Sequence, residues 1–79
     1  MVETRAAPRH RVAKPATIEY GREKIPCTVR DISISGAGLE VSNPRSLPAT
    51  FTLVVPEDGL RLNCSVVRRR DFRVGVRFE

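Results

Sequence analysis

From Ala16 to the end of the chain, apolar and polar residues alternate with a period of two. Successive side chains of a β-strand point to opposite faces, so this alternation predicts strands with one buried face. Turn signals rich in Gly, Pro, Asp, Asn or Ser separate the alternating stretches at intervals of about 8–12 residues. The expected strands are centred on segments 16–20, 25–29, 37–41, 50–55, 60–67 and 72–78. Six short strands with no helical stripe predict an all-β fold, either an antiparallel sandwich or a small closed barrel.

Details of the alternation predict which side chains fill the core. It turns Phe51, Phe72 and Phe78 inward. Val67 is out of phase with the residues before it, which indicates a β-bulge or a strand end that is covered on both faces. Cys27 and Cys64 lie inside alternating segments and form no CxxC pair, so we expect two buried free thiols.

The first fifteen residues differ from the rest. They contain two prolines and four basic residues against one acid, with no apolar periodicity. This composition predicts a flexible basic N-terminal arm at residues 1–15, followed by a single barrel domain at residues 16–79.

Charge narrows the classes of function. The 79-residue chain carries a net charge of +5, and 12 of its 14 basic residues are arginine. Arginine is the cation suited to bidentate contact with phosphate and with base edges, so the bias indicates recognition of an anion or a base. No apolar run reaches the roughly 18 residues of a membrane span or resembles a secretory signal, so we expect no membrane insertion and a cytoplasmic location. A single histidine, no paired carboxylates and no phosphate-binding glycine loop argue against an enzyme, and no cofactor or metal site is expected.

Two short motifs carry the candidate chemistry. Arg5 and Arg9 are four residues apart in the arm, and Asp31, Ser33 and Gly36 follow an apolar strand as DxSxxG. Guanidinium groups can bind phosphate and the O6/N7 edge of guanine, and a carboxylate can accept hydrogen bonds from guanine N–H groups. Glycine would serve a positive φ or leave room for a purine plane. Together the motifs predict binding of a phosphorylated guanine nucleotide.

With both motifs in this order, and with the strands Gly36–Val41 and Val74–Phe78, nearly the whole chain resembles a PilZ domain. The resemblance implies a six-stranded antiparallel β-barrel of the split-barrel type and the bacterial second messenger cyclic di-GMP as the ligand. It also implies that Arg5 and Arg9 contact phosphate and guanine, while Asp31 and Ser33 hold a guanine edge and Gly36 shapes the turn.

Two points stay open. If Val12 sets the register of the arm, Arg11 takes the second arginine role and Ala7 replaces the first; otherwise Arg11 is an additional phosphate contact.

The expected function is a receptor that relays cyclic di-GMP to a protein partner by ordering its arm, as a monomer or weak dimer. The alternatives are a ligand-independent interaction adaptor or a basic nucleic-acid-binding barrel. Nucleic acid is disfavoured because single-strand binders use outward aromatic side chains, and this pattern turns the phenylalanines inward. The run Arg68–Arg70 fits a solvated face or, with Arg73 and Arg77, a positive surface.

Overall fold

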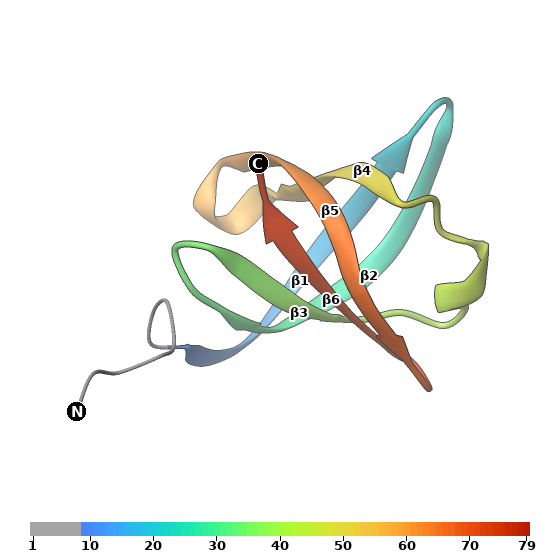
Figure 1. Cartoon of the computed structure of the whole chain (residues 1–79). Coiled ribbons are helices and arrows are strands. Elements are labelled where there is room, and N and C mark those ends of the chain that lie inside the picture. The colour runs from blue at the N-terminus through green and yellow to red at the C-terminus, as the bar shows by residue number, and fades with distance from the viewer. Residues whose placement is uncertain (1–8) are drawn as a thin grey trace.

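The computed structural model describes residues 9–79, and Arg5 lies outside the described residues (Figure 1). The elements are β1 (His10–Tyr20), β2 (Glu23–Ile32), β3 (Gly36–Glu40), η1 (Pro44–Ser46), β4 (Thr50–Val55), η2 (Pro56–Asp58), β5 (Leu60–Arg70) and β6 (Arg73–Phe78), where η1 and η2 are single 3-10 turns. The strands close into a barrel in the order β1-β2-β3-β6-β5-β4, and all neighbours are antiparallel. The barrel confirms the predicted fold and decides between sandwich and barrel. Because the barrel is closed, each strand has a hydrogen-bonded neighbour on both sides, which removes most of the exposed edge that an open sheet would have. Within the described part of the chain, no helix is long and apolar enough to cross a membrane.

The inward positions of the alternation form one core. Ile18, Leu39 and Leu53 are fully buried within it, and no polar or charged side chain of residues 9–79 is buried. Cys27 and Cys64 are buried free thiols, as the sequence predicts. Burial raises the pKa of both thiols from 9.0 to about 11, because the thiolate would lose its hydration.

The first strand is longer than the sequence pattern predicts. β1 begins at His10 instead of near Ala16, so residues 10–15 belong to the barrel wall and not to an arm. Their backbone pairs with the far end of β2, with His10 opposite Ile32. Pro15 is tolerated because β1 pairs with β4 only at Thr17–Glu19, which leaves the other side of Pro15 without a ladder.

The prediction for Phe72 is wrong. β5 continues to Arg70, which pairs with Arg73, so Asp71 and Phe72 form a two-residue hairpin turn. Asp71 takes a left-handed φ of 54°, and the Phe72 side chain is 62% exposed. Phe51 is buried and Phe78 packs against the core, as expected. The alternation could not place Phe72 because it does not show where one strand ends and the next begins.

Candidate functional site

Three strands carry one extra residue relative to a neighbouring strand. The register shifts lie between Arg11 and Lys14 in β1, between Val29 and Asp31 in β2 and between Val66 and Arg68 in β5. The extra residues in the last two cases are Arg30 and Val67. The bulge at Val67 was one of the two readings that the sequence left open for this position, and the structure selects it.

These bulges determine which side chains share the outer face of the barrel. If Arg30 were paired like its neighbours, Asp31 would stand opposite the fully buried Ala37. Because Arg30 is the extra residue, Asp31 stands opposite Gly38 instead. A shift of one residue moves a side chain to the other face, so the bulge turns the Asp31 carboxylate outward. The five residues in register across four ladders are Arg11, Asp31, Gly38, Gly75 and Arg68. We call this set the outer row.

The two glycines in the middle of the outer row form the floor of a hollow. A Cβ atom on Gly38 would come within 2.6 Å of Asp31 Oδ2, so the carboxylate occupies the space that a side chain would take. Gly75 lies beside Arg68 and Val67, whose atoms would be 3.6 and 3.8 Å from an added Cβ. The hollow measures about 310 Å³ and is lined by Arg9, Asp31, Ala37, Gly38, Val67, Arg68, Arg73, Val74 and Gly75.

A second hollow of about 560 Å³ adjoins the first and is strongly basic. Its lining residues are Arg9, Arg11, Val12, Arg30, Asp31 and Arg73, which gives four guanidinium groups against one carboxylate. Arg9, Asp31 and Arg73 line both hollows. The two hollows therefore form one site, with a glycine floor at one end and clustered positive charge at the other. Its combined size is within the usual range of small-molecule pockets, about 300–1,000 Å³.

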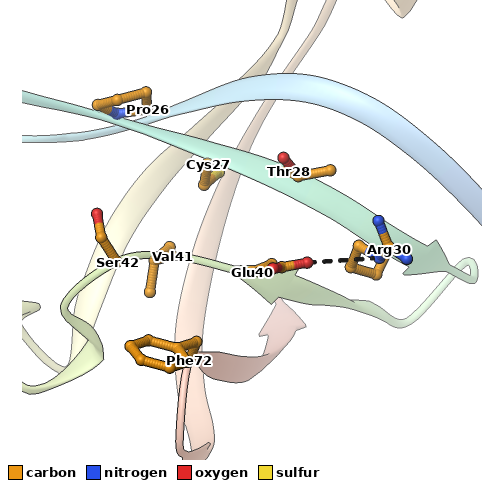
Figure 2. A pocket seen from close by; sticks show the side chains of 8 residues that line it. All are labelled: Pro26, Cys27, Thr28, Arg30, Glu40, Val41, Ser42 and Phe72. Atoms are coloured by element: carbon orange, nitrogen blue, oxygen red, sulfur yellow. Dashed lines mark ion pairs between the residues drawn. The ribbon is translucent and has the colours of Figure 1, made fainter.

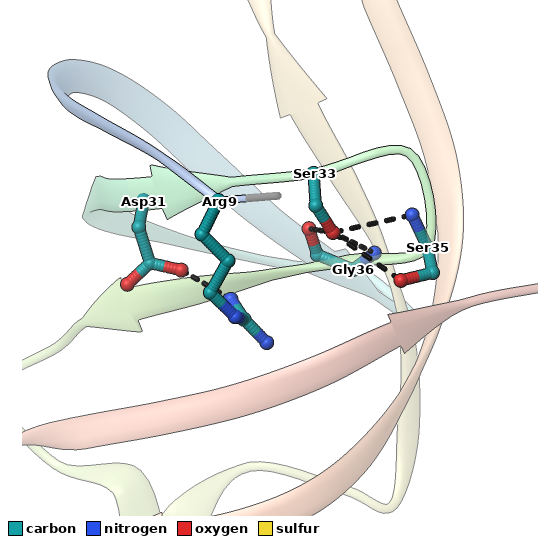
Figure 3. A network of polar contacts seen from close by, with 5 residues as sticks. All are labelled: Arg9, Asp31, Ser33, Ser35 and Gly36. Carbon is teal, nitrogen blue, oxygen red and sulfur yellow. Dashed lines mark hydrogen bonds and ion pairs between the residues drawn. The ribbon is translucent and has the colours of Figure 1, made fainter. Parts of the chain in front are cut away.

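Arg9 and Asp31 form an ion pair at the centre of this site (Figure 3). Arg9 Nη1 donates to Asp31 Oδ1, while Oδ2 of the same carboxylate lies over Gly38. The side chains are 55% and 26% exposed, and such pairs contribute only about 0–1 kcal/mol to stability. An incoming anion can therefore take Arg9 from Asp31 at little cost to the fold.

Ser33 and Gly36 build the turn that follows Asp31 (Figure 3). Ser33 Oγ accepts from the backbone N–H groups of Ser35 and Gly36 at 3.3 Å and donates to the Gly36 carbonyl oxygen at 3.3 Å. Gly36 does not adopt a positive φ. It is required for a different reason, because a Cβ atom there would lie 2.2 Å from the Val76 carbonyl oxygen. Close packing of β3 on β6, rather than a left-handed turn, accounts for this glycine.

In a comparison with family models, the model of the PilZ domain matches residues 3–79. The chain belongs to the PilZ domain family. PilZ domains are in general receptors for cyclic di-GMP, and as binding domains they are generally non-enzymatic. No curated protein matches this chain.

This PilZ domain brings together some of the residues that the motifs single out. Arg9, Arg11 and Asp31 line one hollow, and Arg11 stands directly opposite Asp31 in the β1–β2 ladder. Ser33 and Gly36 are not among the described residues that line the two hollows, since they serve the adjoining turn. Which arginines fill the RxxxR roles stays a prediction, because Arg5 lies outside the described residues.

Sequence reasoning did not assign the two glycines of this site, Gly38 and Gly75, or three of its arginines, Arg30, Arg68 and Arg73. The alternation already placed Gly38 and Gly75 on outward positions, and two outward glycines in a barrel wall were an available signal. Arg68 and Arg73 were noted only as part of a positive surface, and Arg30 was not singled out, because their positions depend on bulges and on the length of β5. Among residues 9–79, no group of three His, Cys, Asp or Glu side chains lies close enough to hold a metal ion.

Proposed function

We propose that this PilZ domain binds cyclic di-GMP at the site around Arg9 and Asp31 and acts as a receptor in the bacterial cytoplasm. The observation that carries the proposal is the position of one outward carboxylate between a glycine floor and four arginines. A guanine nucleotide needs these two halves side by side: an acceptor for its base N–H groups and cations for its phosphates.

The glycine floor accommodates a base. A flat ring can lie against the backbone at Gly75, which has no side chain, and Val67 offers an apolar wall. Asp31 Oδ2 already lies over Gly38, where it can accept from guanine N1–H and N2–H. Adenine lacks this pair of donors, so Asp31 favours guanine.

The basic end accommodates the phosphates. Arg11, Arg30 and Arg73 surround the larger hollow, and Arg9 can leave Asp31 to join them. The Arg9–Asp31 pair is partly exposed and contributes little to stability, so a phosphate that also contacts the neighbouring guanidinium groups can take Arg9 from it. Arg5 joins this set in the proposal through its place in the RxxxR motif. Ser33 and Gly36 support the site by fixing the turn after Asp31, and fixing the N-terminal arginines on the ligand provides the signal for a partner.

Calorimetric titration of the full chain with cyclic di-GMP tests the proposal. We expect Arg9→Ala to weaken binding by roughly 10- to 100-fold, because it removes a charge-assisted contact worth about 1.5–3 kcal/mol. Arg22→Ala is the matched control: it makes the same charge change in the turn at the other end of β1. Equal loss in both variants would show only a general effect of net charge, and unchanged binding by Arg9→Ala would refute the assignment.

A second titration separates guanine recognition from simple phosphate binding. The wild-type chain should bind cyclic di-AMP at least about tenfold more weakly than cyclic di-GMP, and Asp31→Asn should narrow this ratio. Equal binding of the two dinucleotides would contradict the role of Asp31. Absence of binding to both would favour the ligand-independent adaptor.

A further inference from the structure

A third hollow lies beside the exposed Phe72 on a different part of the barrel wall (Figure 2). Its volume is about 560 Å³, and its lining residues are Pro26, Cys27, Thr28, Arg30, Glu40, Val41, Ser42 and Phe72. The Phe72 ring stands on one side, facing Val41, and the Arg30–Glu40 ion pair closes one end (Figure 2). Phe72 is one of three large apolar side chains of residues 9–79 that are mostly exposed, and it is the only aromatic one.

The hollow exists because β3 is shorter than its neighbour. β2 extends back to Glu23, but it pairs with β3 only between Thr28 and Ile32. After Glu40, the Val41 N–H donates to the Phe72 carbonyl oxygen at 2.8 Å, which ties the chain to the β5–β6 turn. The stretch of β2 around Pro26 is therefore not covered by a third strand. Pro26 has no N–H to offer an added strand, so the hollow suits side chains better than a β-strand.

The surroundings of Phe72 carry more positive than negative charge. Arg70 and Arg73 flank the turn, Asp71 lies within it, and all three are exposed. Glu40, the acid in the hollow, is already paired, with Glu40 Oε1 at 3.6 Å from Arg30 Nε. An exposed aromatic ring with adjacent arginines has the composition of protein–protein interface hot spots, where aromatic residues and arginine are enriched.

We infer that Phe72 and this third hollow form a docking site for a partner protein that presents an apolar side chain within an acidic segment. The apolar side chain packs between Phe72 and Val41, and the flanking carboxylates pair with Arg70 and Arg73. Charge complementarity favours this occupant over a second copy of the chain, which carries the same positive charge at this turn. It is also favoured over single-stranded nucleic acid, because such ligands stack on several aromatic side chains and Phe72 stands alone.

The docking site is physically connected to the proposed nucleotide site, and this second step rests on the proposed function. Arg30 lines both hollows, and Arg73 lines the nucleotide site while adjoining Phe72 in the chain. Phosphates that attract Arg30 would leave Glu40 unpaired in the third hollow and would neutralise Arg73. Both changes repel an acidic segment, so cyclic di-GMP and the partner weaken each other's binding. Linkage makes the effect reciprocal, with a typical coupling of about 5- to 150-fold.

A peptide titration followed by amide NMR shifts tests the docking site in the full chain without nucleotide. The probes are a synthetic peptide with Leu flanked by two Glu on each side, the same peptide with Ser for Leu, and one with Lys for Glu. We expect only the first to shift the amides of residues 27–28, 40–42 and 70–73. Phe72→Ala should weaken its binding at least about tenfold, while Ile34→Ala, which removes a side chain that is 89% exposed on another loop, should not.

Each alternative outcome overturns the inference in a recognisable way. No shift at these amides with millimolar peptide, or equal binding by Phe72→Ala, would show that the surface does not dock such a segment. Tighter binding of a single-stranded oligonucleotide that depends on Phe72 would assign the surface to nucleic acid.

Repeating the titration with saturating cyclic di-GMP tests the coupling. The dissociation constant of the Leu-containing peptide should rise on the order of tenfold, and Glu40→Gln should reduce this ratio. An unchanged dissociation constant would refute the coupling and leave the docking site in place. If calorimetry detected no cyclic di-GMP binding, the proposed function would fail while the nucleotide-free titration still decided the docking site.

Discussion

The two sides of this barrel wall are built differently. The β4–β5 ladder pairs six consecutive positions without a register shift, from Thr50 opposite Ser65 to Val55 opposite Leu60. The ladders of β2 with β3 and of β5 with β6 are each interrupted by one extra residue. Both sides supply core residues, such as Leu53 on the regular side and Leu39 on the bulged side, but only the bulged side also turns a carboxylate, two glycines and several arginines outward.

The difference between the two sides shows how a barrel wall can add residues for recognition to its outer face. A regular ladder buries every second side chain and leaves little choice about the outer face. A bulge moves one residue across the wall at the cost of one unpaired position, so it can present a polar side chain without burying it. In this barrel the bulges lie beside the candidate site, and each one brings a member of the outer row into register.

The largest expected effect is a loss of folding stability when a core residue of the regular side is shortened. Leu53→Ala removes a fully buried side chain whose neighbours in the ladders are Ile18 and Leu62. We expect a loss of about 2–5 kcal/mol in the free energy of unfolding, which a domain of this size barely tolerates. Urea unfolding measures the loss. A loss below about 1 kcal/mol would contradict a major contribution of this side to the core.

Substitutions of two glycines in β3 separate an effect on packing from an effect on ligand binding within one strand. Gly36→Ala places a Cβ against the Val76 carbonyl oxygen, so backbone must move, and we expect about 1–3 kcal/mol of destabilisation. Gly38→Ala displaces only the end of the Asp31 side chain, so it should cost less stability. It should nevertheless weaken cyclic di-GMP binding on the order of tenfold, because it fills the floor of the smaller hollow. Thermal unfolding and calorimetry on both variants give the comparison. The reverse ranking of the two stabilities would contradict this account.

Most of the fold was predictable from the period-two alternation and the turn signals. These fixed the six strands and their inward faces, including the buried thiols Cys27 and Cys64. The start of β1 was missed because Pro8, Pro15 and the basic residues mask an extended segment that takes its hydrogen bonds from β2. Phe72 was missed because both strands of its hairpin have the same period, so the turn position is not visible in the pattern.

Much less of the candidate site was predictable. The motifs found Arg9, Arg11 and Asp31 because their chemistry is local to short segments. Arg30 and Arg73 join them only through the closure of the barrel and the bulges, which place residues of three strands around one hollow. A period of two in one strand carries no information about its register with a neighbour, so the outer row could not be read from the sequence.

The core thiols, Cys27 on the bulged side and Cys64 on the regular side, provide a pH test of the shared core. Their pKa is raised from 9.0 to about 11 in the folded state, so between these values the unfolded chain binds fewer protons than the folded one. Stability is therefore unaffected below pH 9.0 and falls as the pH rises toward about 11, by at most about 1.4 kcal/mol per pH unit for each thiol. Urea unfolding at a series of pH values measures the slope. Cys64→Ala should reduce it, while retaining the parallel loss from Lys14, whose pKa is raised by its hydrogen bond to Asp58. An unchanged slope would mean that Cys64 does not titrate on unfolding.

The smallest expected effect compares one ion pair from each side. Arg61 on β5 pairs with Glu19 on β1 at 3.0 Å across the regular side, and Arg9 pairs with Asp31 on the bulged side. Both pairs are partly exposed, so Glu19→Gln and Asp31→Asn should each change stability by only about 0–1 kcal/mol. Only Asp31→Asn should alter cyclic di-GMP binding, because Glu19 faces no hollow of the candidate site. If Asp31→Asn instead destabilised the barrel strongly and Glu19→Gln did not, Asp31 would be a structural residue of the bulge, and the distinction between the two sides would no longer account for the outward carboxylate.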